Sequence, residues 1–162
     1  SLLPNSKAMH CLVGLRGVGK TIVMLQLANK FENSIYVSSE QLLLRSVSFY
    51  DFITYTKQKG FTNIFLDEMH LYPNWQLELK AAFDEGGAKI TFSGSSALFI
   101  TQGSADLSRR VVVHNLAPLS FREFLALKYG ASLPVATIEE LVDFEKRKSL
   151  ISVIAPYMNR MG

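Results

Sequence analysis

Residues 14–21 read Gly-Leu-Arg-Gly-Val-Gly-Lys-Thr, the most informative segment of this chain. It fits the pattern G-x-x-x-x-G-K-[ST], in which glycines let consecutive backbone N–H groups surround a phosphate. An apolar run at residues 9–13 precedes the loop, and another at residues 22–28 follows it. Because the motif requires a strand before the loop and a helix after it, this setting predicts a nucleoside triphosphate site.

The loop assigns a role to several of its side chains. The Lys20 ammonium group is expected to contact the β and γ phosphates, and the Thr21 hydroxyl is expected to hold Mg²⁺. The dipole of the following helix adds partial positive charge at the same place. The residues predicted to bind nucleotide are Gly14, Arg16, Gly17, Val18, Gly19, Lys20, Thr21 and Ile22.

Two adjacent carboxylates follow a second apolar run. Residues 64–66, Ile-Phe-Leu, are typical of a strand buried on both faces of a parallel sheet, and Asp67 and Glu68 come directly after them. Open α/β sheets bind their ligands at the carboxyl ends of the strands. We therefore expect Asp67 to hold Mg²⁺ beside Thr21, and Glu68 to polarise a water for attack on the γ phosphate.

Strands and helices alternate along the first two thirds of the chain. Helices are predicted over residues 20–31 and 49–59 and from a cap at Asn74 to Gly86, with Trp75 in the core. Strands are predicted over residues 9–13, 34–37, 63–66, 89–92 and 111–113. This alternation predicts an α/β sandwich with a parallel central sheet.

The last third of the chain is predicted to be helical. Ser120 with Glu123 and Thr137 with Glu140 each form the capping-box pattern that starts a helix. We therefore divide the chain into an α/β core, residues 1–117, and a helical segment, residues 118–162.

Composition excludes some classes of protein. The 162 residues carry 17 basic and 14 acidic side chains, and a net charge of +3 does not by itself imply a nucleic-acid partner. No apolar run reaches eighteen residues and no secretory leader is evident, so no membrane span is predicted. The single cysteine, Cys11, fits a reducing, cytoplasmic location. His10 and His114 lack the spacing of a metal site, so no zinc is predicted.

The motifs together resemble the prokaryotic AAA+-type ATPases, a family of P-loop proteins known as "predicted ATPases". The resemblance rests on residues 14–21, on the segment from Asp-Glu-Met-His to Pro-Asn-Trp at 67–75, on Ser-Gly-Ser-Ser at 93–96, and on Leu-Ala-Pro-Leu-Ser-Phe-Arg-Glu-Phe at 116–124. It implies a three-layer P-loop NTPase fold with a five-stranded parallel sheet. The loop strand would lie between the strands that carry Ser93 and Val112, with the Asp67 strand beyond Ser93.

The resemblance also implies further site residues. Ser93 and Ser95 match the sensor position that contacts the γ phosphate or the attacking water. Arg110, just before the fifth strand, matches an arginine that acts on phosphate in cis or across subunits. The family usually has glycine where this chain has Arg109, which leaves open which arginine acts. Residues 118–162 would begin a helical lid, and we expect the chain to be a piece of a longer protein with a further C-terminal domain.

The leading functional hypothesis is an ATP-binding, Mg²⁺-dependent ATPase that acts as a switch for an attached domain or a partner protein. The alternatives are a small-molecule P-loop kinase and a nucleotide-gated nucleic-acid-binding module. Kinases of this type usually need an arginine-rich lid, and the scattered basic residues do not support DNA binding. Residues 29–32, Asn-Lys-Phe-Glu, superficially match a guanine-reading segment, but they lie on the predicted helix directly after the loop and do not support a GTPase.

Overall fold

The computed structural model describes residues 8–95, 109–133 and 135–158. The chain forms two compact units, Ser1–Pro118 and Leu119–Gly162, and each is described by itself. The first unit contains the sheet and the helices that cover it, and the second contains helices.

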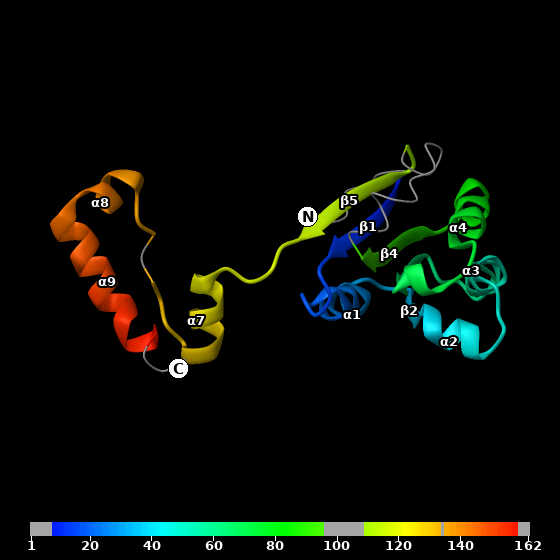
Figure 1. The fold of residues 1–162 in the computed structure, drawn as a ribbon. Helices are drawn as coiled ribbons and strands as arrows, with labels where there is room; N and C mark the ends of the chain where they lie inside the picture. Colours follow the sequence, from blue (N-terminus) through cyan, green and yellow to red (C-terminus); the bar gives the residue numbers. More distant parts are fainter. Residues whose placement is uncertain (1–7, 96–108, 134, 159–162) are drawn as a thin grey trace. The chain divides into compact units, whose positions relative to one another are not determined.

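A five-stranded parallel sheet forms the centre of the first unit (Figure 1). Its strands are β1 (Met9–Gly14), β2 (Ser34–Ser38), β3 (Asn63–Asp67), β4 (Lys89–Ser95) and β5 (Val111–Leu116). The order across the sheet is β2-β3-β4-β1-β5. Both the parallel sheet and the place of β1 between β4 and β5 confirm the prediction, and β3 lies beyond β4 as expected.

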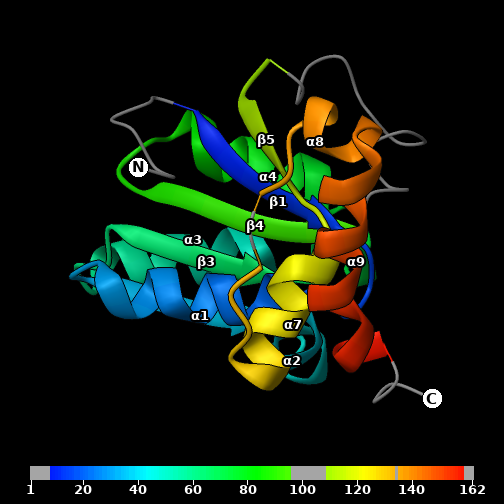
Figure 2. The same cartoon turned by 90° about the vertical axis from the view of Figure 1, so that its left-hand side faces the viewer.

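Helices cover both faces of this sheet. In chain order they are α1 (Lys20–Lys30), α2 (Ser39–Leu44), α3 (Phe49–Gln58), a short 3₁₀ helix η1 (Met69–Leu71) and α4 (Trp75–Asp84). Figure 2 shows α1, in blue, on the near face of the sheet and α3 behind it. Phe65 packs in the cluster with Met24 of α1, while Ile64 and Leu66 pack in the cluster of α3 and α4. The apolar run that predicted a strand buried on both faces is therefore confirmed.

Two local features differ from the predictions. Helix α2 was not predicted, although Ser38 and Gln41 form a complete capping box at its start. Asn74 does precede α4, but it adopts a left-handed conformation with φ of 55° and its side chain caps no backbone N–H. Trp75 is buried against Phe92, with ring centroids 5.7 Å apart, as expected for a core residue.

The second unit is helical, as predicted. It contains α7 (Phe121–Tyr129), α8 (Ile138–Val142) and α9 (Phe144–Met158). The capping boxes at Ser120 and Thr137 are both formed, and Leu125 is fully buried. Rings of Tyr129 and Tyr157 pack 5.7 Å apart, which ties α7 to α9. No helix within the described parts of the chain combines the length and the apolar character that crossing a membrane requires.

Candidate functional site

The glycine loop joins β1 to α1 and needs its glycines for two different reasons. Gly17 and Gly19 have φ of 79° and 101°, a left-handed conformation that side chains with a Cβ rarely adopt. Gly14 has no positive φ, but a Cβ there would lie 2.6 Å from the Leu116 carbonyl oxygen of β5. The loop can therefore pass close to β5 and turn its backbone at the start of α1.

Lys20 folds back across this loop. Its Nζ donates hydrogen bonds to the carbonyl oxygens of Gly14, at 3.0 Å, and Leu15, at 2.9 Å. These bonds hold the ammonium group at the first turn of α1, where the helix dipole also favours an anion. Positive charge is therefore concentrated at the loop.

Thr21 and Asp67 meet at the carboxyl edge of the sheet. The Thr21 hydroxyl donates a hydrogen bond of 2.7 Å to Asp67 Oδ2. Only 2% of the Asp67 surface is exposed. The two residues that were predicted to share a metal ion are thus in direct contact.

Asp67 accepts four hydrogen bonds from the residues that the structure describes. Ser93 Oγ and the Glu68 backbone N–H donate to Oδ1, while Thr21 Oγ1 and the Tyr36 hydroxyl, at 2.8 Å, donate to Oδ2. Tyr36 comes from β2 and was not predicted as a site residue. Burial, with the hydrogen bond to Asp67 second, raises the pKa of the Tyr36 phenol above its usual value, so the hydroxyl remains protonated and able to donate.

The Glu68 backbone is held in a costly conformation. Its φ of 55° and ψ of 41° are left-handed, which costs a residue with a Cβ about 1–2 kcal/mol. Its N–H donates to Asp67 Oδ1 and Ser93 Oγ, and its carbonyl accepts from Ser39 Oγ at 2.7 Å and from Leu71 N at 3.0 Å. Such conformations persist where surrounding contacts fix them, and they are concentrated at functional sites.

A hollow of about 440 Å³ lies beside the loop. Its walls bring together the predicted phosphate-binding loop and the predicted catalytic carboxylate, and they add one further acid. The lining residues are Arg16, Gly17, Gly19, Lys20, Thr21, Glu40, Glu68, His70 and Leu71. Three of the residues predicted to bind nucleotide do not line this hollow: Gly14, which is buried, Val18, which is half-buried, and Ile22, which is exposed on α1.

Ser93 has contacts that were not predicted. Its side chain is fully buried, donates to Asp67 and accepts from the Glu68 backbone N–H at 3.0 Å. Ser93 is not among the residues that line the hollow, and its described contacts are to Asp67 and Glu68; its predicted contact with the γ phosphate or the attacking water stays a prediction. Ser95 pairs with Gly14 in the sheet register, and its side chain lies outside the described residues.

Arg110 lies at the opposite edge of the sheet from the loop. Its carbonyl oxygen accepts a hydrogen bond from the backbone N–H of Met9, the first residue of β1, whereas the loop follows the last. A six-residue strand separates the two edges by about 20 Å. Arg110 Nε also forms a 3.0 Å ion pair with Asp84. A contact between Arg110 and a phosphate bound to its own loop is therefore excluded, which corrects the cis alternative; exposed Arg109 precedes Arg110 in the same turn.

His10 and His114, for which the sequence predicted no metal site, lie within hydrogen-bonding distance of each other. His10 Nδ1 and His114 Nε2 lie 2.9 Å apart on neighbouring strands β1 and β5. Burial and, after it, the nearby charges of His114 and Lys89 lower the pKa of His10. Among the described residues no group of three or more His, Cys, Asp and Glu could hold a metal ion.

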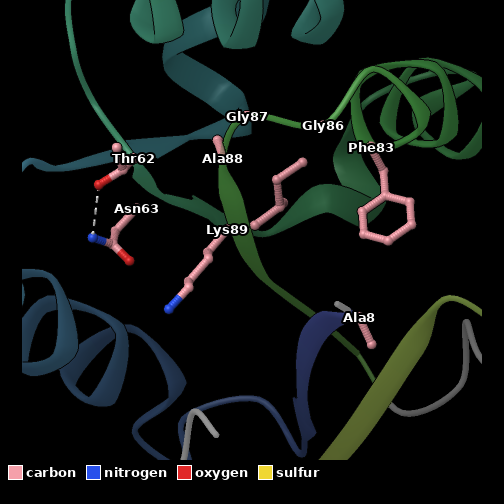
Figure 3. A pocket seen from close by; sticks show the side chains of 9 residues that line it. Ala8, Thr62, Asn63, Phe83, Gly86, Gly87, Ala88 and Lys89 are labelled. Atoms are coloured by element: carbon pink, nitrogen blue, oxygen red, sulfur yellow. Dashed lines mark hydrogen bonds between the residues drawn. The ribbon is translucent and has the colours of Figure 1, made fainter. Parts of the chain in front are cut away.

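A second hollow, of about 510 Å³, opens at the amino edge of the sheet (Figure 3). Thr62, Asn63 and Lys89 contribute polar side chains at the beginnings of β3 and β4. Ligands of open α/β sheets bind at the carboxyl edge, so this hollow does not compete with the loop as the candidate site.

A match to a known protein family covers the glycine loop and the sheet. The family model described as "AAA domain" matches residues 6–125. The chain belongs to this AAA domain family. The AAA domain is thus a nucleotide-binding, ATPase-like domain, and the match includes the loop, Asp67 and Glu68.

Curated relatives of this AAA domain occur in Methanocaldococcus jannaschii. The uncharacterized protein MJ1637 is 32% identical over 141 residues, and the uncharacterized protein MJ1544 is 27% identical over 146 residues. The alignments cover 76% and 86% of this chain but 28% and 33% of the relatives, so the chain spans about a third of their length. Among solved structures, the one titled "Structure of C. elegans PCH-2" matches 87% of this chain and 46% of its own, with 14% identity and a TM-score of 0.48.

Proposed function

We propose that this AAA domain binds Mg²⁺-ATP, hydrolyses it and acts as a nucleotide-controlled switch for an attached domain or a partner protein. The observation that carries the proposal is the 2.7 Å hydrogen bond between Thr21 and Asp67, beside a hollow lined by the glycine loop. It supports a site in which the loop and the end of β3 act on one ligand.

The loop fits a triphosphate chain. Gly17 and Gly19 line the hollow with backbone rather than with side chains, and Lys20 lines it beside them. Backbone N–H groups at a helix N-terminus and a nearby ammonium group together form an anion site. The Lys20 ammonium would exchange its two carbonyl acceptors for phosphate oxygens.

The donor set also fits Mg²⁺. Thr21 offers a hydroxyl and Asp67 a carboxylate, and Mg²⁺ prefers oxygen groups of these kinds, which it binds directly or through its own waters. With its proton directed to Asp67, the Thr21 oxygen keeps its lone pairs for a cation. A bound Mg²⁺ would neutralise charge on the transferred phosphoryl group.

Glu68 is the proposed general base. Glu68 lines the hollow together with the loop, and its backbone is fixed by contacts to Asp67, Ser93, Ser39 and Leu71. In this proposal the carboxylate takes the proton of the water that attacks the γ phosphorus, while Lys20 holds the phosphate in line.

The remaining elements of the proposal concern the switch. Ser39 of α2 donates a hydrogen bond to the Glu68 carbonyl oxygen. A movement of the Glu68 backbone would therefore act directly on α2, which follows the edge strand β2. Residues 118–162 would serve as the start of a lid, and Ser95 as a sensor. Arg110 would act on a nucleotide held by another copy of the chain.

The proposal also includes a cytoplasmic location, which the free, buried Cys11 supports.

The decisive experiment compares Glu68→Gln with the wild type. We expect Glu68→Gln to bind Mg²⁺-ATP with wild-type affinity and to form ADP about 10²–10⁴-fold more slowly. Glu32→Gln, on the exposed turn after α1, is the matched control and should hydrolyse ATP at the wild-type rate.

The reaction contains no phosphate acceptor other than water, so ADP formation separates an ATPase from a small-molecule kinase. If the wild type binds Mg²⁺-ATP and forms ADP only when an acceptor is added, the kinase replaces the ATPase. If the protein does not bind DNA even at low salt, the nucleic-acid-binding module is excluded.

A further inference from the structure

Asp67 has no acceptor position to spare among the contacts described. A carboxylate offers about four lone-pair positions, and the four hydrogen bonds to Asp67 are divided evenly between its two oxygens. If Mg²⁺ binds here as proposed above, its water shell needs an acceptor on this carboxylate, because Mg²⁺ usually keeps several waters. One of the present donors must then leave.

Three of the four donors are tied to their places. The Glu68 N–H is part of a backbone that is fixed on both sides, and Ser93 is fully buried on β4. Thr21 Oγ1 belongs to the cation site itself.

Tyr36 differs from these donors in two ways. It lies on β2, at the edge of the sheet, and its side chain is half-buried rather than enclosed. Its hydroxyl is at the end of a long side chain and has Asp67 Oδ2 as its acceptor. Rotation of this one side chain would free an acceptor position without disturbing the backbone of β3.

We propose that Tyr36 is a positioning residue that opposes Mg²⁺ at the nucleotide site, because its hydroxyl occupies the acceptor position of Asp67 that a Mg²⁺-bound water requires. This inference rests on the proposed Mg²⁺-nucleotide function. With ADP but without the cation, Tyr36 completes the hydrogen bonding of the buried carboxylate. When the cation binds, the Tyr36 hydroxyl releases Asp67.

The test measures metal binding rather than turnover. Mn²⁺, a paramagnetic substitute for Mg²⁺, is titrated into the full chain saturated with ADP, and free Mn²⁺ is measured by electron paramagnetic resonance. We expect Tyr36→Phe to reach half-saturation at a Mn²⁺ concentration about two- to tenfold lower than the wild type, the range that one net hydrogen bond allows. Tyr55→Phe, at an exposed tyrosine of α3, should match the wild type.

Two other outcomes are possible, and they contradict different proposals. An unchanged or higher half-saturation concentration for Tyr36→Phe overturns the role of Tyr36 but leaves the nucleotide site intact. A wild type that binds ADP without any ADP-dependent Mn²⁺ binding overturns the metal part of the proposed function, and the Tyr36 inference with it.

A second measurement uses the unaltered protein and so does not depend on the folding of the variant. The assigned ¹³Cζ resonance of Tyr36 should shift when Mg²⁺ is added to the ADP complex, because its hydrogen bond to Asp67 is lost, while that of Tyr55 should not. A Tyr36 resonance that stays in place contradicts the inference.

Discussion

Thr21 and Asp67 lie 46 positions apart in the sequence, yet the Thr21 hydroxyl donates a 2.7 Å hydrogen bond to Asp67 Oδ2. The bond joins the first turn of α1, the helix that follows β1, to the end of β3, and β4 lies between β1 and β3 in the sheet. It makes the glycine loop and the acidic strand end parts of one site.

Replacing Lys20 should remove nucleotide binding. The wild type, with Mg²⁺-ATP at a hundred times its dissociation constant, should gain about 2.7 kcal/mol of stability, or a melting temperature higher by about 5–10 °C. Lys20→Ala should show no such rise, because the ammonium group beside Gly14 and Leu15 is lost. Lys30→Ala, in the last turn of the same helix, should keep the full rise. Thermal melts with and without ligand measure both, and a full rise in Lys20→Ala would refute the assignment.

Ser93→Ala distinguishes a supporting serine from a phosphate sensor. Because the Ser93 hydroxyl contacts Asp67 and the Glu68 backbone rather than a phosphate, we expect its loss to change the Mg²⁺ concentration needed for nucleotide binding by the same factor for ADP and ATP. The unliganded protein should also lose about 1–3 kcal/mol of stability, since buried polar groups lose a partner. Calorimetric titrations with each nucleotide give the comparison. A loss confined to ATP would support the direct γ-phosphate contact.

Gly14→Ala should destabilise the fold itself. The added methyl group would meet the Leu116 carbonyl oxygen at 2.6 Å and Val18 Cγ1 at 2.9 Å. Overpacking of this kind costs about 1–3 kcal/mol. Urea unfolding should show this loss, whereas Gly94→Ala should be tolerated, because a Cβ built there has no atom of the described residues within 4 Å apart from those of Gly94 and its two chain neighbours. Equal stability of the two variants would mean that β5 moves aside.

His10 should make stability depend on pH. Since the pKa of His10 is lowered from 6.5 in the folded protein, the unfolded chain binds more protons once the pH falls towards that value. The contribution of His10 is therefore complete above pH about 6.5 and is lost as the pH falls below it, by at most about 1.4 kcal/mol per pH unit. Urea unfolding at pH about 5.5 and about 7.5 should show a larger acid loss in the wild type than in His10→Gln. Equal losses would show that His10 does not titrate as described.

Local patterns predicted most of the fold. The run Ile64-Phe65-Leu66 predicted a strand covered on both sides, and the capping boxes at Ser120 and Thr137 predicted where helices start; all three are observed. These signals work because burial and capping are decided within a few residues. The same capping pattern at Ser38 was available for α2 but was not used.

Contacts between distant residues could not be predicted in the same way. The sequence placed Thr21 beside Asp67 because a known motif relates them, but no motif relates Tyr36 or Ser39 to the acidic pair. The pairing of His10 with His114 depends on the register of β1 against β5, which a single sequence does not determine. Arg110 was placed correctly before its strand, and the parallel direction of the sheet then put it at the wrong edge for a cis role.

At Glu68 the residue type that suits the left-handed backbone differs from the residue type that supplies an acid. Asparagine and glycine adopt that conformation more readily than glutamate, so either substitution would relieve local strain while removing the acid. If Glu68 is the general base as proposed, the acid group therefore costs the fold part of its stability, and a more heat-resistant variant made at this position would be an inactive one.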